Sequence, residues 1–421
     1  MRDVRMRGFR ERVSVAAALA ILEPRTGSLA DEATPILEAA GRVAAADVTA
    51  QISVPHFARA AMDGYALSGE ATFGAGSHAV VALPIVGGAL PGRPFSGSIG
   101  QREAIRITTG APMPPGADAV LMAEHAEEEN RGGVATLLVT EAVPPGKHVG
   151  AVGEDVREGA VVVSRGRRLR PQDVGVLSAV GVASMVVVKR PSVRILLTGD
   201  EILPPGSTPT GASIADANGP MLAALARRDG AVSIAVEYVP DLREAVREAL
   251  IGAREDVILI SGGSSVGSED HAPLVLAEIG ELVVHGVAMR PSSPAGFGFL
   301  GPGNLRPAFL LPGNPVSCLC AYEFFAGPTI RALGGLPRRW PHARRRCQVA
   351  SKIVSALGRT DYARVAVDGD RNRVTPIMTS GASILSSTTR ADGVVIVGED
   401  EEGHGEGAWV EVLLYDGAGS Q

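Results

Sequence analysis

The feature that most constrains the fold is a regular alternation of short apolar segments and helix-length segments over residues 186–335. Runs of aliphatic and β-branched residues favour strands, and each is followed by a segment with helical periodicity. Such alternation is typical of a mostly parallel, doubly wound sheet in a three-layer α/β domain. The predicted strands cover 193–197, 232–239, 257–260, 282–287 and 308–311, and the predicted helices cover 220–228, 242–253, 272–279 and 316–333.

The regions on either side of this domain have a different texture, with short β-branched segments broken by Gly and Pro. This texture predicts a β-rich subdomain before the α/β domain and a second small β domain after it, with a hairpin turn at Asp368-Gly369-Asp370. Further helices are predicted at 13–23, 31–46 and 172–180. The predicted domains are 1–47 together with 146–185, 48–145, 186–335 and 336–421.

Composition excludes several functional classes. A formal net charge of -6 and an aromatic content of 4% argue against a nucleic-acid partner. The three cysteines, Cys318, Cys320 and Cys347, are too few for a disulfide framework, and their spacing is a poor zinc signature. No apolar run approaches the ~20 residues that span a bilayer. We therefore expect a cytoplasmic protein without a membrane partner.

Ligands of open α/β sheets bind beyond the carboxyl ends of the strands, so the loops at that edge are the candidate site. Each of these loops is rich in glycine, hydroxyl or acidic residues. They read Thr198-Gly199-Asp200-Glu201, Pro240-Asp241, Ser261-Gly262-Gly263-Ser264-Ser265-Val266-Gly267 with Glu269-Asp270, and Pro312-Gly313-Asn314-Pro315 with Ser317.

Glycine- and hydroxyl-rich loops present bare backbone N–H groups that can wrap a phosphate, and the loop at 312–315 leads into a helix N-terminus. The acidic residues would repel that anion unless a divalent cation lies between them, and hard oxygen ligands favour Mg²⁺. Taken alone, Asp241 is explained as a helix cap and Gly313 as a turn residue. The absence of a P-loop or a Rossmann fingerprint disfavours an ordinary kinase or dehydrogenase.

Motifs spread along nearly the whole chain resemble the molybdopterin molybdenumtransferase family, which includes the bacterial MoeA proteins and the E domain of gephyrin. They include the four stretches above at the sheet edge. The others are Ala61-Met62-Asp63-Gly64-Tyr65, Thr109-Gly110-Ala111-Pro112, Gly153-Glu154-Asp155, Asn218-Gly219-Pro220-Met221 and Gly358-Arg359.

The resemblance implies Mg²⁺-dependent insertion of molybdate into adenylylated molybdopterin with release of AMP. It also implies an elongated homodimer of four subdomains per chain, in which Asp63 and Thr109 act across the dimer interface, and a C-terminal β-barrel-like domain. The implied catalytic residues are Asp63, Thr109, Asp155, Glu201, Asp241 and Asp270, of which Asp241 and Asp270 would hold Mg²⁺. The implied substrate-binding residues are Thr198, Gly199, Asp200, Ser261, Gly262, Gly263, Ser265, Gly267, Pro312, Gly313, Asn314 and Ser317.

One departure from the family concerns the molybdate site. Where the family has Lys-Pro-Gly-Lys-Pro, this chain has Arg290-Pro291-Ser292-Ser293-Pro294, so that one ammonium group is lost and another becomes a guanidinium. The predicted molybdate ligands are Arg290, Ser293, Arg359 and Ser386. The alternative is a non-catalytic paralogue that binds or carries molybdopterin. A scaffold role rests on analogy with gephyrin alone.

Overall fold

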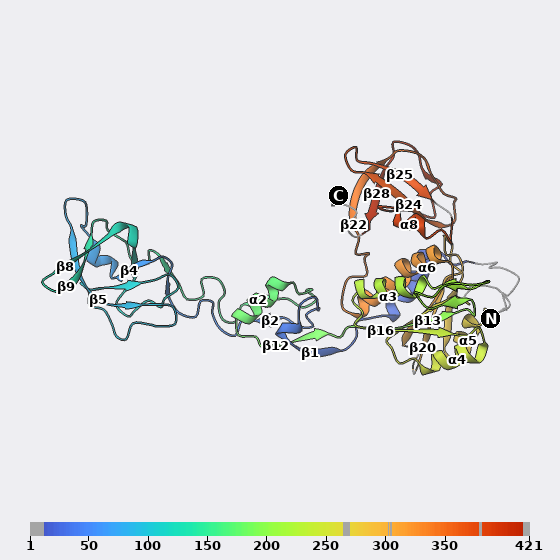
Figure 1. The fold of residues 1–421 in the computed structure, drawn as a ribbon, viewed down its shortest axis with the longest axis horizontal. Coiled ribbons are helices and arrows are strands. Elements are labelled where there is room, and N and C mark those ends of the chain that lie inside the picture. Colours follow the sequence, from blue (N-terminus) through green and yellow to red (C-terminus); the bar gives the residue numbers. More distant parts are fainter. Residues whose placement is uncertain (1–11, 264–269, 302, 304, 379–380, 416–421) are drawn as a thin grey trace. The chain divides into compact units, whose positions relative to one another are not determined.

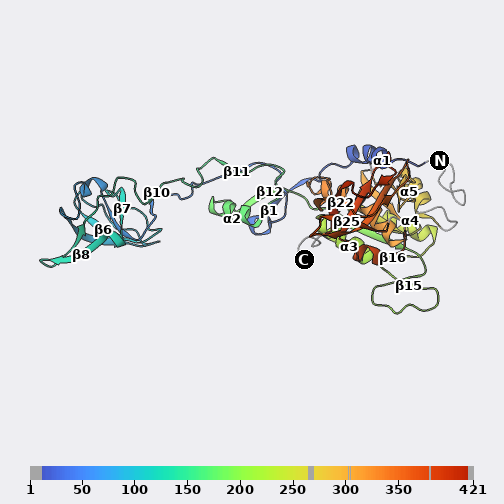
Figure 2. The same cartoon turned by 90° about the horizontal axis from the view of Figure 1, so that it is seen from above.

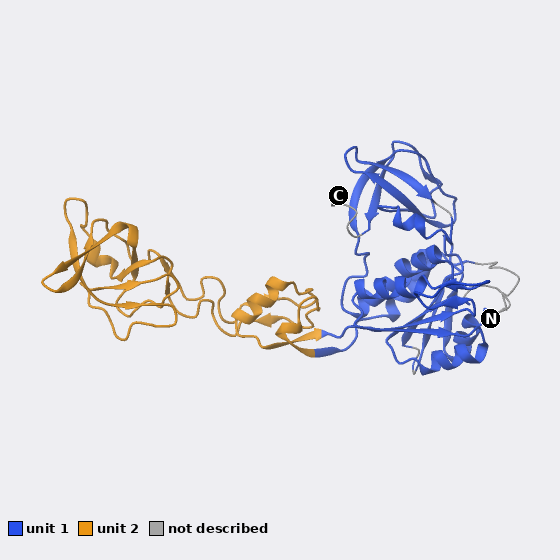
Figure 3. Ribbon diagram, viewed as in Figure 1, with its two compact units in different colours: residues 1–32, 188–421 blue, residues 33–187 orange. Residues whose placement is uncertain are grey.

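The computed structural model describes residues 12–263, 270–301, 303, 305–378 and 381–415. The chain divides into two compact units, residues 1–32 with 188–421 and residues 33–187 (Figure 3). No helix in the described ranges is long and apolar enough to cross a membrane.

The first unit contains the predicted α/β domain. Its six-stranded sheet has the order β16-β13-β17-β21-β20-β18, with parallel pairing among the first four strands and antiparallel pairing of β20 with both of its neighbours. The strands are β13 Ser192–Thr198, β16 Ser233–Val239, β17 Val257–Ser261, β18 Glu281–His285, β20 Gly296–Leu300 and β21 Arg306–Leu311. The predicted mostly parallel sheet is confirmed, although β20 was not anticipated.

Helices cover both faces of this sheet, which confirms the three-layer prediction. One face packs against α1, α3, α6 and α7, and the other packs against α4 and α5 (Figure 1). The helices are α1 Val15–Leu22, α3 Asn218–Arg228, α4 Arg243–Gly252, α5 Ala272–Ile279, α6 Pro315–Ala321 and α7 Gly327–Leu333, with a π-helical turn at Tyr322–Ala326 between the last two. Alternation along a strand explains the two cores, because Ile195 faces the first core and Leu196 faces the second.

The end of the chain forms the expected barrel-like domain. Strands β24, β25, β22, β28 and β26 pair in sequence, and β26 closes the ring by pairing with β24. The hairpin predicted at Asp368 is confirmed, because this residue pairs with Arg373 across the turn. The elements are β19 Met289–Arg290, β22 Ala343–Val349, β23 Ile353–Val354, β24 Thr360–Asp368, β25 Arg373–Met378, α8 Ser386–Thr389, β26 Gly393–Val397, β27 Gly403–His404 and β28 Trp409–Leu414.

The second unit is β-rich, as predicted. Its main sheet has the order β7-β4-β6-β5-β9-β8. These strands are β4 Gly64–Leu67, β5 Val81–Ala89, β6 Ala104–Ile107, β7 Ala119–Met122, β8 Ala126–Arg131 and β9 Val134–Val139. Smaller pieces complete the unit, namely β2 Val48–Thr49 paired with β11 Val161–Val163, β3 Arg59–Ala60 paired with β10 Val149–Gly150, and helix α2 Pro171–Ala179.

Two local predictions were wrong. The helix predicted at 31–46 is replaced by β1, Asp31–Pro35, which pairs with β12, Ser184–Val188, and by a short 3-10 turn at Ile36–Glu38. Pro35 explains the difference, because its ring disfavours helical geometry at the preceding residue. Asp241 was expected to cap α4, but Leu242 occupies the N-cap position and α4 has no side-chain cap. The Asp241 carboxylate is therefore not used by the helix.

Candidate functional site

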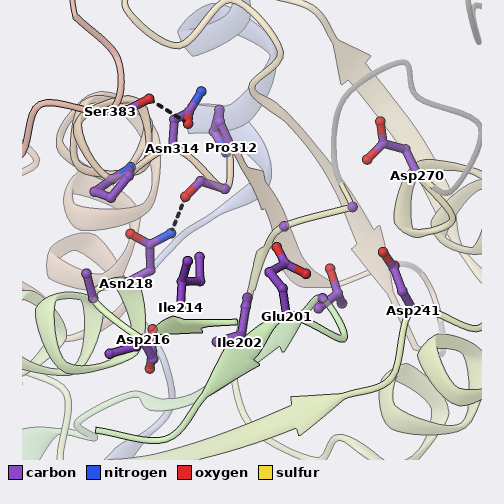
Figure 4. A pocket seen from close by; sticks show the side chains of 18 of the residues that line it. Glu201, Ile202, Ile214, Asp216, Asn218, Asp241, Asp270, Pro312, Asn314 and Ser383 are labelled. Carbon is purple, nitrogen blue, oxygen red and sulfur yellow. Dashed lines mark hydrogen bonds between the residues drawn. The ribbon is translucent and has the colours of Figure 1, made fainter. Parts of the chain in front are cut away.

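A cavity of about 570 Å³ lies at the carboxyl edge of the parallel strands (Figure 4). Its lining comes from the loops that follow β13, β16, β17 and β21, because the ends of neighbouring parallel strands meet at one edge. The predicted residues that line it are Thr198, Gly199, Glu201, Asp241, Gly262, Gly263, Asp270, Pro312, Gly313 and Asn314. The structure thus gathers loops that are more than 100 residues apart in the sequence.

Close packing of backbone explains the glycines after β17. Gly262 has a φ of +93°, and a Cβ atom there would lie 2.2 Å from the carbonyl oxygen of Thr198. Gly263 has a φ of +54°, and a Cβ atom there would lie 2.9 Å from Thr198 Oγ1. Both positions need a conformation that glycine adopts most readily. The bare loop therefore brings its backbone against the end of β13.

Four carboxylates face one another at this edge. Burial raises the pKa of Asp241, and the charges of Asp200, Asp270 and Glu201 raise it further, while His271 opposes them. The backbone N–H of Asp241 donates to Asp200 Oδ1 at 3.1 Å, but Asp241 Oδ1 is buried and has no hydrogen-bond partner in the described part of the chain. This group of negative charges is suited to a cation.

The carboxylate oxygens in the pocket suit Mg²⁺ better than a metal whose whole coordination shell comes from protein side chains. Glu201, Asp241 and Asp270 supply hard carboxylate oxygens to the pocket. Within the described ranges, no three acidic, His or Cys side chains are close enough to enclose an ion. Mg²⁺ commonly uses one or two carboxylates and completes its shell with water and phosphate oxygens. Open coordination of this kind matches a site that also receives a phosphate-bearing ligand.

Asn218 joins three segments of the pocket wall. Its Nδ2 donates to Ser261 Oγ at 2.9 Å and to the carbonyl oxygen of Gly313 at 2.7 Å (Figure 4). A carbonyl oxygen can only accept, so these bonds fix which way the amide faces. Asn218 Oδ1 and Thr198 Oγ1 are buried without hydrogen-bond partners among the described residues. Asn218 was part of a quoted motif, but the sequence did not show this bridging role.

One wall of the pocket was missed by sequence reasoning. Ile202 and Ile214 line this wall. They lie on two short parallel strands, β14 Ile202–Leu203 and β15 Ile214–Ala215. The loop that connects these strands extends away from the sheet (Figure 2). Asp216 follows β15 and accepts hydrogen bonds from the Gly219 N–H and the Tyr238 hydroxyl, each at 2.9 Å. Burial and the bond to Asp216 raise the pKa of Tyr238 to about 12. In the sequence, the Asp-x-x-Gly spacing of Asp216 and Gly219 at the start of a helix could have predicted this hydrogen bond.

The barrel domain contributes to the opposite wall. Ser383 lines the pocket, and its hydroxyl donates to Asn314 Oδ1 at 2.9 Å. The N–H of Val316 donates to the carbonyl oxygen of Ala382 at 2.9 Å. Pro294, at the end of the altered segment, also lines the cavity. The pocket therefore extends from the acidic sheet edge toward the barrel.

The four residues predicted to bind molybdate are placed differently from the rest. In the described part of the chain, none of them lines the cavity. Arg290 and Arg359 come together at Asp361, whose two oxygens accept one bond from each guanidinium. Ser293 accepts a bond from the Val287 N–H through its carbonyl oxygen, and Ser386 is exposed at the start of α8. The structure thus pairs the two arginines through one carboxylate.

The remaining predicted residues fall into three groups. Asp63 Oδ1 in the second unit accepts from the Thr109 backbone N–H at 2.7 Å and from its hydroxyl at 2.8 Å, and these bonds lower the pKa of Asp63. Asp155 lies elsewhere in that unit, where its N–H donates to the Val54 carbonyl oxygen at 3.0 Å. Ser261 and Ser317 are buried behind the pocket surface. Ser265 and Gly267 lie outside the described residues.

Comparison with known proteins agrees with this arrangement. Residues 13–181 match the MoeA N-terminal region (domain I and II), residues 194–332 match a "probable molybdopterin binding domain", and residues 346–415 match the MoeA C-terminal region (domain IV). The chain is 32% identical to molybdopterin molybdenumtransferase 2 of Mycobacterium tuberculosis, over 87% of this chain and 90% of that protein. It is 32% identical to the molybdopterin molybdenumtransferase of Haemophilus influenzae, over 78% of this chain and 79% of that protein.

A comparison with solved structures agrees with the sequence matches. The crystal structure of the molybdopterin biosynthesis MoeA protein from Pyrococcus horikosii superposes with a TM-score of 0.82 at 33% identity, and covers 97% of this chain and 100% of that chain. Sequence and fold agree over nearly the whole length, including both β regions and the α/β domain. The chain therefore belongs to the MoeA family of molybdopterin molybdenumtransferases, which are transferases of molybdenum cofactor biosynthesis.

Proposed function

We propose that this protein catalyses the Mg²⁺-dependent insertion of molybdate into adenylylated molybdopterin and releases AMP. The observation that carries the proposal is the pocket itself. It combines a bare glycine loop after β17 with the carboxylates of Glu201, Asp241 and Asp270. Such a surface attracts a phosphate-bearing ligand only when a divalent cation offsets the negative charge.

Each part of the pocket then has a role. Asp241 and Asp270 bind Mg²⁺, which supplies charge neutralisation at the phosphate oxygens of the adenylylated substrate. The backbone N–H of Gly263 binds the anionic part of that substrate, while the Gly262 N–H donates to the Leu311 carbonyl oxygen at 3.3 Å and fixes the loop. Asn218 holds the loop containing Gly313 against the end of β17, so that the wall keeps its shape. Glu201 adds a third carboxylate to the pocket wall.

We further propose that the protein works as a homodimer in the cytoplasm, with Asp63 and Thr109 of one chain completing the site of the other. The hydrogen-bonded Asp63–Thr109 pair supports this role, because a carboxylate fixed by two donors is already oriented. Asp155 is proposed as a further polar residue of that surface. The domain division 1–47 with 146–185, 48–145, 186–335 and 336–421 is part of the same proposal.

The second candidate function is a paralogue that binds or carries molybdopterin without inserting the metal. The altered segment 290–294 favours it, because the chain has one cation fewer than the family pattern. Both remaining guanidiniums are also bonded to Asp361. This candidate predicts pterin binding without molybdate-dependent release of AMP.

The deciding experiment measures AMP release from adenylylated molybdopterin by the purified protein with Mg²⁺ across a molybdate titration. The proposed function predicts release that rises with molybdate and is lost in Asp270→Asn. Glu244→Gln is the matched control, because it removes one exposed carboxylate from α4 of the same domain. Tight pterin binding without release would support the carrier, and full activity of D270N would remove Asp270 from the mechanism.

A further inference from the structure

A buried carboxylate joins the two cations that the sequence analysis assigned to molybdate. Asp361 is fully buried on β24, and its Oδ2 lies 2.5 Å from Arg290 Nη2 while its Oδ1 lies 2.9 Å from Arg359 Nε. Arg290 is on β19, which pairs in parallel with β24 so that Arg290 and Asp361 are direct partners. One carboxylate therefore links an arginine on β19 to an arginine that immediately precedes β24.

The bonding pattern leaves donors unused. Arg359 contributes only its Nε to Asp361, and Arg290 contributes only its Nη2, to Asp361 and to the carbonyl oxygen of Val354. In the described part of the chain, we find no other bonds for these two guanidiniums. Their side chains are 31% and 32% exposed, whereas Asp361 is 0% exposed. Two cations and one anion leave the cluster with a formal charge of +1, and neither arginine side chain is fully buried.

A buried ion pair alone is weak evidence for any role beyond stability. Here, however, Arg290 Nη1 and both Nη atoms of Arg359 make no bond within the described ranges, although Arg290 Nε is buried and unpartnered there. Planar guanidiniums bind tetrahedral oxyanions through paired N–H donors. An arginine that is already held in place loses little side-chain freedom when the anion arrives, which favours binding.

We infer that Asp361 is a positioning residue, which holds Arg290 and Arg359 together as one preassembled oxyanion-binding pair. This inference rests on the proposed function, since molybdate is the oxyanion concerned. Asp361 itself does not touch the anion in this scheme. Its contribution is to fix two guanidiniums in a chain whose altered segment has lost an ammonium group.

The test uses Asp361→Asn in the full-length protein. Asparagine keeps the shape of Asp361, but its NH₂ group faces one of the two guanidiniums, so one arginine is released. We expect the KM for molybdate to rise about tenfold. The kcat at saturating molybdate and the affinity for adenylylated molybdopterin should change less than twofold. Asp368→Asn is the matched control, because it removes a half-exposed carboxylate from the end of the same strand.

Two further measurements keep the inference open to refutation. Calorimetric titration with molybdate alone, without pterin, should show weaker binding to D361N than to the wild type, and this readout does not need turnover. If D361N does not fold, Arg359→Lys tests the same idea, because an ammonium group bound to Asp361 cannot offer a planar fork to the anion. R359K should also show weaker molybdate binding while Asp361 is intact.

The possible results distinguish a failure of the positioning role from a failure of the proposed function. A lower melting temperature of D361N with an unchanged molybdate KM and unchanged molybdate binding would make Asp361 a purely structural tie and overturn the inference. If D361N does not fold, unchanged molybdate binding by R359K would overturn it as well. A wild-type protein that binds molybdate, but releases no AMP, would contradict the proposed function and leave the positioning role intact. Failure of the wild type to bind molybdate would overturn both.

Discussion

The acidic sheet edge and the arginine pair are two charged regions of the same unit, and they handle their charge in opposite ways. At the sheet edge, Asp241 is raised in pKa by burial and by neighbouring carboxylates, and one of its oxygens has no partner among the described residues. At the junction of β19 and β24, Arg290 and Arg359 share the buried Asp361. The first region therefore concentrates negative charge, which Mg²⁺ would offset under the proposed function, whereas the second contains its own counter-charge.

The largest expected effect comes from Gly262→Ala, which tests whether the sheet edge depends on close backbone packing. The added Cβ would lie 2.2 Å from the Thr198 carbonyl oxygen at a φ of +93°. We expect the free energy of unfolding to fall by at least about 2 kcal/mol and AMP release to be lost. Urea unfolding and the AMP assay measure both. Gly407→Ala is the control, because its φ is +80° but nothing lies within 4 Å of its Cβ position. Equal losses in the two variants would show that backbone conformation, and not contact with Thr198, is the cause.

The next effect is expected from Asn218→Asp, which keeps the size of the side chain and removes its donor. A carboxylate oxygen would then face the carbonyl oxygen of Gly313, which can only accept. We expect a loss of about 2–3 kcal/mol in stability and a higher KM for adenylylated molybdopterin, with the KM for molybdate less affected. Steady-state kinetics with each substrate varied in turn would check this. A selective rise in the KM for molybdate would contradict the separation of the two regions.

Asp241→Asn should change the stability less than the two variants above, and it should raise the melting temperature instead of lowering it. Since the pKa of Asp241 is raised in the folded protein, its ionisation opposes folding as the pH rises above the ordinary carboxyl value of about 4. Without Mg²⁺ the variant should therefore melt a few degrees higher than the wild type at neutral pH, and this gain should vanish below about pH 4. Asp200, Glu201 and Asp270 repel the Asp241 charge, and His271 attracts it.

Adding Mg²⁺ should reverse the order of the two proteins. A ligand that binds only the folded state stabilises it in proportion to its affinity, and D241N loses one of the proposed ligands. Differential scanning calorimetry with and without Mg²⁺ measures the change. A wild-type protein whose melting temperature ignores millimolar Mg²⁺ would show that the acidic edge is not a cation site.

The fold was largely predictable because hydrophobic periodicity and strand–helix alternation are local signals. The parallel strands and their edge followed from that pattern, and so did the glycine loop at Gly262. Strand β20 could not be inferred, because no helix separates it from β21 and two glycines interrupt its apolar run. At 31–35, the influence of Pro35 on the preceding residue outweighed an apparent helix pattern.

Contacts between distant residues were the part of the site that the sequence could not show. Arg290 and Arg359 were recognised as cations, but their shared bond to Asp361 depends on the pairing of β19 with β24. The bridge from Asn218 to Gly313 likewise crosses 95 residues. Such bonds depend on which strands become neighbours, and residue type and spacing do not specify that. Local motifs therefore identified the loops, and the structure identified the residues that hold them in place.

The smallest expected effect is that of Ser383→Ala, which tests where the sheet-edge pocket meets the barrel. Its hydroxyl makes one exposed hydrogen bond to Asn314, so we expect less than about 1 kcal/mol of lost stability. Asn314 begins α6 and its loop lines the cavity, so the substrate should be held less firmly when this bond is absent. We expect a two- to threefold rise in the KM for adenylylated molybdopterin and an unchanged KM for molybdate. Ser351→Ala is the matched control, since that serine is exposed in the same barrel domain and does not line the pocket. If S383A instead raises the KM for molybdate, then the acidic edge and the arginine pair act on one shared ligand surface and the contrast between them must be redrawn.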